Sequence, residues 1–64
     1  MIDKFAKTLV EKIRVDMNDL CDTLASGRVK SFEDYRYTCG ILRGLAVAEE
    51  AIKDLAKRNE ESDE

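Results

Sequence analysis

Apolar side chains recur at helical spacing through the first part of the chain. They are separated by alternating steps of three and four residues, which is typical of an amphipathic helix. A helix is therefore predicted over about residues 3–26, with an apolar arc of roughly 160° that leaves Val15 outside. The arc consists of Ala6, Leu9, Ile13, Met17, Leu20 and Leu24.

A second helix is predicted over about residues 32–58, and its apolar surface is wider. Two adjacent sides together cover roughly 200°, which is more than one antiparallel neighbour can bury. One side contains Tyr35, Cys39, Leu42 and Ala46. The other contains Ile41, Leu45, Ala48, Ile52 and Leu55. The surplus predicts a second contact surface on this helix.

The connection between the helices carries signals for a helix end and a helix start. Gly27 fits the position after a helix, where the left-handed conformation carries no steric penalty for glycine. Ser31 fits an N-cap, with Glu33 and Asp34 favourably placed in the first turn. A loop over residues 27–30 is short enough to make the helices antiparallel. The predicted fold class is all-α, a single two-helix hairpin.

A chain of 64 residues buries only about 60% of its unfolded surface even when compact. Small scaffolds usually add disulfides, a metal or oligomerisation. We expect oligomerisation into a dimeric four-helix bundle or a larger ring or shell. Whether helices pair within or between chains stays open.

Small residues mark the second helix as the contact surface. Gly40, Gly44 and Ala48 are spaced four apart, which permits close approach of another helix, between chains or inside the hairpin. Arg43 suggests an interface anchor, or else a salt bridge to Glu11 or Asp19 across the hairpin. The predicted interface comprises Tyr35, Tyr37, Gly40, Ile41, Arg43, Gly44, Leu45, Ala48 and Ile52.

Aromatic and basic residues meet at the loop end of the second helix. Arg28, Lys30 and Arg36 are a possible partner contact there, because basic and aromatic side chains together can bind nucleic acid or protein. The alternative is that Phe32 and Tyr35 begin the core while the basic side chains are solvated.

The net charge of −3 arises in the tail, residues 59–64, which carries four carboxylates. The remainder has 11 basic and 10 acidic residues. A near-neutral body argues against nonspecific nucleic-acid binding. The tail itself is expected to be a solvated end, or to neutralise a basic partner surface.

Candidate catalytic chemistry is sparse. The chain has no His, so no nucleophile–base pair of the usual kind can form. Cys21 and Cys39 do not have the spacing of a zinc site, and both are expected to be reduced, buried thiols. We therefore expect no enzyme activity, no cofactor and no metal.

We also expect no targeting segment. The first residues lack an apolar leader region. The longest weakly charged stretch, residues 37–48, is shorter than the roughly 18 residues of a spanning helix. A soluble protein of the cytoplasm is expected.

The turn Gly27-Arg28-Val29-Lys30-Ser31-Phe32-Glu33-Asp34-Tyr35 precedes Gly40-Ile41-Leu42-Arg43-Gly44-Leu45. This combination resembles small helical-hairpin proteins of tailed bacteriophages. The resemblance implies a virion-associated or assembly role, with the second helix as the docking face and the virion as a possible location.

In length and hairpin architecture alone, the chain is also similar to the plasmid regulator Rop, a four-helix bundle that binds RNA. The sequence therefore favours a structural or protein-interaction module. The alternatives are a Rop-like nucleic-acid-binding regulator and a small phage inhibitor that binds a host protein.

Overall fold

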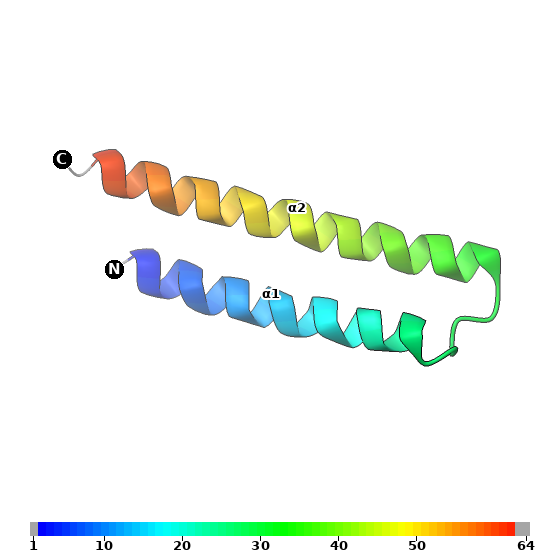
Figure 1. Ribbon diagram of the computed structural model, residues 1–64. Coiled ribbons are helices and arrows are strands. Elements are labelled where there is room, and N and C mark those ends of the chain that lie inside the picture. Colours follow the sequence, from blue (N-terminus) through cyan, green and yellow to red (C-terminus); the bar gives the residue numbers. More distant parts are fainter. Residues whose placement is uncertain (1, 63–64) are drawn as a thin grey trace.

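The computed structural model describes the backbone of residues 2–62 and the side-chain exposure of residues 4–58. Within that range the chain forms two helices, α1 (Ile2–Ala25) and α2 (Phe32–Ser62), which lie side by side and antiparallel (Figure 1). The connection turns the chain back, so that α1 starts at the end of the hairpin where α2 finishes (Figure 1). The predicted all-α two-helix hairpin is confirmed.

The end of α1 has the geometry that its glycine predicts, one residue earlier than expected. Gly27 has a φ of 79°, a left-handed conformation that glycine adopts freely. Its N–H donates to the carbonyl of Leu24 at 3.4 Å, and the N–H of Ser26 donates to the carbonyl of Asp22 at 2.9 Å. Two carbonyls of the last turn are thereby satisfied.

Ser31 is the N-cap of α2, as predicted. Its hydroxyl oxygen accepts a hydrogen bond from the N–H of Asp34 at 3.0 Å. Its carbonyl accepts the first helical bond from the N–H of Tyr35, also at 3.0 Å. Glu33 and Asp34 place negative charge in the first turn, where it interacts favourably with the helix dipole.

α2 continues to Ser62, beyond the predicted end at residue 58. Nothing after Gly44 breaks a helix, because neither proline nor glycine follows it in the sequence. An ion pair of 3.2 Å between Arg58 and Asp54 links successive turns. The backbone of residues 59–62 is therefore helical, although the sequence was expected to form a tail there. The last two residues lie outside the described range.

The helices meet along a seam in which successive residues are four and three positions apart. This spacing presents one residue per turn to the neighbouring helix, as in a coiled coil. The α1 side of the seam is Ala6, Val10, Ile13, Met17, Leu20 and Leu24. The α2 side is Thr38, Leu42, Leu45, Glu49, Ile52 and Ala56.

Over the residues whose exposure is described, the hairpin by itself has no fully buried apolar core. Among the described side chains, no hydrophobic residue is buried, and the apolar residues of the seam are only half-buried. The molecule measures 51 × 16 × 11 Å, with a radius of gyration of 15.0 Å. A compact domain of this length has a radius of gyration of about 11 Å. The single hairpin is thus a thin layer with two open sides.

The cysteines differ from the prediction. Both are free, but Cys21 is exposed and Cys39 is half-buried. The prediction of a buried thiol is wrong for Cys21. This residue follows Leu20 directly, and one helical step turns it about 100° away from the seam.

Candidate interaction surface

Two different faces flank the seam of the hairpin. One is rich in exposed apolar and small residues, and we call it the apolar face: Phe5, Leu9, Ile41, Gly44, Ala48 and Leu55. The other is rich in charge, and we call it the charged face: Lys7, Glu11, Arg14, Lys53 and Lys57. The two faces differ because each helix has a separate stripe of residues on each side of its seam residues, and the two stripes differ in composition.

The apolar face is hollowed near the ends of the chain. Its largest side chains there are Phe5 and Leu55, which are 70% and 65% exposed. With their neighbours they line a hollow of ≈ 180 Å³ whose walls are almost wholly apolar. The lining residues are Phe5, Ala6, Leu9, Ile52, Leu55 and Ala56. Phe5 and Leu55 thus leave apolar side chains open to solvent at this end of the face.

Towards the loop, the same face changes character. A second hollow of ≈ 390 Å³ is lined by Asp16, Asp19 and Leu20 of α1 and by Ile41 and Leu45 of α2. Here α2 provides the apolar wall and α1 provides carboxylates. The apolar face is therefore continuous along α2 but becomes acidic along α1.

Gly40 and Gly44 lie away from α1. A Cβ atom added at either position would have nothing within 4 Å outside its own helix. Close approach of α1 therefore does not explain the two glycines, which was the hairpin-internal alternative. The space over Gly44 is open on the side of the apolar face.

The predicted interface residues are divided between several sides of α2. Ile41, Leu45, Ala48 and Ile52 lie on the apolar face or at its edge, because they share helical spacing. Arg43 is exposed and lies about 160° around the helix from Ile41. Its predicted salt bridge to Glu11 or Asp19 is not found in the described part of the chain.

The loop end of α2 carries an exposed aromatic group. The rings of Phe32 and Tyr35 stack at a centroid distance of 6.3 Å with an interplanar angle of 23°. The guanidinium carbon of Arg36 lies 6.0 Å from the centroid of the Phe32 ring. Both rings and Tyr37 are exposed, so Phe32 and Tyr35 do not begin a core as the alternative proposed. Arg28 and Lys30 are also exposed.

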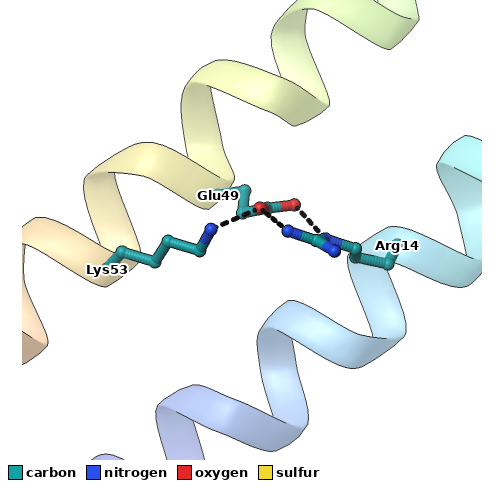
Figure 2. A network of polar contacts seen from close by, with 3 residues as sticks. All are labelled: Arg14, Glu49 and Lys53. Carbon is teal, nitrogen blue, oxygen red and sulfur yellow. Dashed lines mark hydrogen bonds and ion pairs between the residues drawn. The ribbon is translucent and has the colours of Figure 1, made fainter.

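Glu49 is the one buried residue among the described side chains, with 7% of its surface exposed. Arg14 of α1 binds it with two parallel hydrogen bonds, from Nε to Oε1 at 3.1 Å and from Nη2 to Oε2 at 2.8 Å. Lys53 Nζ lies 2.9 Å from Oε2. Figure 2 shows the carboxylate held between the two cations, one from each helix. This two-point contact fixes how α1 and α2 are aligned along their length.

The cations lower the pKa of Glu49 to about 2, first through the hydrogen bond from Arg14 and then through that from Lys53. The same contact raises the pKa of Arg14. Because the carboxyl group has a lower pKa when folded than when unfolded, its ionised form stabilises the fold above the unfolded value. That contribution disappears as the pH falls from about 4.5 to about 2.

We expect Glu49→Gln to melt at a lower temperature than the unmodified protein near neutral pH, where it lacks the ion pair. The gap in melting temperature should narrow between about pH 5 and about pH 2, since the carboxyl group becomes protonated there. Thermal melts followed by circular dichroism at stepped pH measure it. Glu50→Gln, at an exposed neighbouring position, is the matched control. A constant gap across this range would contradict the assignment.

The contact between Arg14 and Glu49 was not predicted from the sequence. One signal for Glu49 was available. It continues the four-and-three spacing from Leu42 through Ile52, at a position where an apolar residue is usual. A carboxylate at such a position needs a cation from the neighbouring helix.

Comparisons with protein-family models, with curated proteins and with solved structures find no match for this chain. Neither α1 nor α2, over the residues described, is long and apolar enough to cross a membrane. The described side chains also contain no group of three or more potential metal ligands. The geometry of the two faces is therefore the basis for a functional proposal.

Proposed function

We propose that this chain is a non-enzymatic structural or protein-interaction module that works by association of its hairpin through α2. The observation that carries the proposal is the open apolar face. Ile41 is 38% exposed and Leu55 is 65% exposed, although both lie on a helix that already packs against a neighbour. Completing the burial of these side chains would contribute about 25 cal/mol for each Å² of apolar surface removed from water, and this supports association through the face.

The total surface supports the same proposal. The single hairpin exposes 5323 Å², whereas a compact protein of 7.3 kDa exposes about 4200 Å². The excess of about 1100 Å² arises because the hairpin is a single layer of two helices, in which each helix has only one neighbour. Docking of further helices would remove it.

We expect Gly44→Leu to reduce the mass of the assembly while helix content is kept or increased. Leucine is the better helix former by about 0.8–1 kcal/mol, yet its side chain would occupy the open space on the apolar face. Light scattering and circular dichroism on the same samples measure the two effects. Gly40→Leu is the matched control, because it brings the same gain in helix propensity further from Ala48. Equal mass for both variants and the unmodified protein would contradict the proposal.

The setting we propose is the assembly of a phage particle, in which the chain is a small virion or assembly component. This part of the proposal rests on the resemblance of residues 27–45 to phage hairpin proteins. Mass spectrometry of purified particles from the source of the sequence tests it. Absence of the chain from both mature and immature particles would contradict the setting without affecting the association itself.

A nucleic-acid-binding hairpin in the manner of Rop is the second candidate. The exposed stack of Phe32 and Tyr35 with Arg36 favours it, because aromatic rings and guanidinium groups bind bases. The near-neutral body opposes it. Binding to single-stranded RNA that weakens steeply with added salt would support this candidate over the first.

Binding to a host protein, as an inhibitor, would use the same apolar face and leave the chain monomeric before it meets that protein.

A further inference from the structure

The α2 stripe of the apolar face is self-complementary when a second copy is turned end for end. We infer that a second copy of this chain packs on it with α1 against α1 and α2 against α2, around a two-fold axis that passes close to Ala48. This inference rests on the proposed association and adds the partner, the face and the arrangement. The product is a four-helix bundle in which all neighbouring helices are antiparallel.

The alignment within the hairpin determines which residues would meet. Arg14 lies opposite Glu49, so the middle of α1 is level with Ala48. On α2, the residues facing outward from the apolar face are four and three positions apart, as in a coiled-coil stripe. They are Tyr37, Ile41, Gly44, Ala48, Ala51 and Leu55.

Large and small residues of this α2 stripe alternate in a way that suits reversal. With Ala48 at the axis, Ile41 lies opposite Leu55 of the second copy, because they are equally far from Ala48 in opposite directions. Gly44 of one copy lies close to Ala51 of the other, because they are four and three residues from Ala48 in opposite directions. Large side chains therefore meet at two points, and the small residues between them let the helices approach closely.

Charge on the matching stripe of α1 selects this arrangement. That stripe contains Phe5, Leu9, Lys12, Asp16, Asp19 and Thr23. Lys12 and Asp16 lie at equal distances on either side of Arg14, so reversal brings each Lys12 to Asp16 of the other copy. A second copy with its loop at the same end would instead place α1 against α2 of the other copy, whose stripe has no charged residue, so Lys12 and Asp16 would lose their oppositely charged partners.

The area is suited to a stable dimer. Two separate hairpins expose 5323 Å² each, and a compact protein of twice the mass exposes about 6900 Å². Association into one compact bundle thus buries about 3700 Å², within the range of about 2000–5000 Å² that obligate homodimers bury.

The test uses two charge variants, Lys12→Asp and Asp16→Lys, alone and mixed. Each variant alone turns two attractive pairs per dimer into two repulsive ones, so its self-association should weaken about tenfold or more at low salt. In an equimolar mixture both pairs become attractive again. The mixture should therefore form a heterodimer with close to the original affinity, measured by sedimentation and by native mass spectrometry.

Matched controls carry the same changes of charge on the outer side of α1. Lys4 and Asp22 are both exposed there. Lys4→Asp and Asp22→Lys should associate as the unmodified protein does, and mixing them should give no preference for the heterodimer. In about 1 M salt the preference shown by the Lys12→Asp and Asp16→Lys mixture should disappear, because charges at the rim are screened.

Disulfide cross-linking tests the same arrangement independently of these charges. With both native cysteines replaced by serine, Ala48→Cys should oxidise to a covalent dimer at least about tenfold faster than Val47→Cys, because only the former lies at the axis. A dimer with equal cross-linking rates and no heterodimer preference overturns this arrangement and leaves association intact. An unmodified protein that is monomeric throughout overturns the proposed function as well.

Discussion

Ile41→Asp is expected to dissociate the assembly into chains that are largely unfolded. Ile41 is 38% exposed in the single hairpin, and association would bury the rest of its side chain in both copies. Losing this contact twice weakens the dimer by about 3 kcal/mol or more, which is more than a hundredfold in the dissociation constant. The carboxylate adds a further penalty, because it would be buried without a cation.

Val47→Asp is the matched control for this prediction. Val47 is 60% exposed and lies on the outer side of α2, so the same carboxylate should change stability by only about 0.5 kcal/mol. Urea unfolding at several protein concentrations, followed by circular dichroism, measures both variants. If Val47→Asp were as disruptive as Ile41→Asp, the apolar face would have no special role.

Glu49→Leu is expected to raise the melting temperature. Glu49 occupies a seam position where leucine would pack against the half-buried apolar residues of α1. Leucine at this position would remove the cost of holding a carboxylate away from water and would add apolar packing. Arg14 is largely exposed and stays hydrated after its partner is removed.

Leucine and glutamate are similar helix formers, so helix propensity does not account for a gain. Glu50→Leu, at the exposed neighbouring position, controls for added hydrophobicity and should leave the melting temperature nearly unchanged. A melting temperature for Glu49→Leu below that of the unmodified protein would mean that the ion pair contributes more than apolar packing. The network would then be a main source of stability.

Local signals made the helices and their connection predictable. Gly27 and Ser31 act through their own backbone geometry and hydrogen bonds, which depend on few neighbours. The end of α2 was harder to predict, because a charged segment without glycine or proline can be either helical or an irregular tail. Charge alone gave no reason for the helix to stop at Arg58.

The path of the seam could not be predicted, because it depends on how two helices fit together. The sequence shows two apolar sides on α2, and either could have faced α1. In the structure the seam runs between them, through Leu42, Leu45 and Ile52, and it includes Glu49. That course leaves Ile41 and Leu55 on one side of the seam and Cys39 and Ala46 on the other. The cation that makes Glu49 acceptable comes from α1, about half the chain away.

The mass of the protein in solution, measured together with its helicity, tests the central claim most directly. Light scattering and circular dichroism over a range of micromolar concentrations should give twice the chain mass, with helicity lost as dilution dissociates the dimer. A monomer with full helicity and a cooperative melt over the same range would contradict the claim that this hairpin needs a partner on its apolar face.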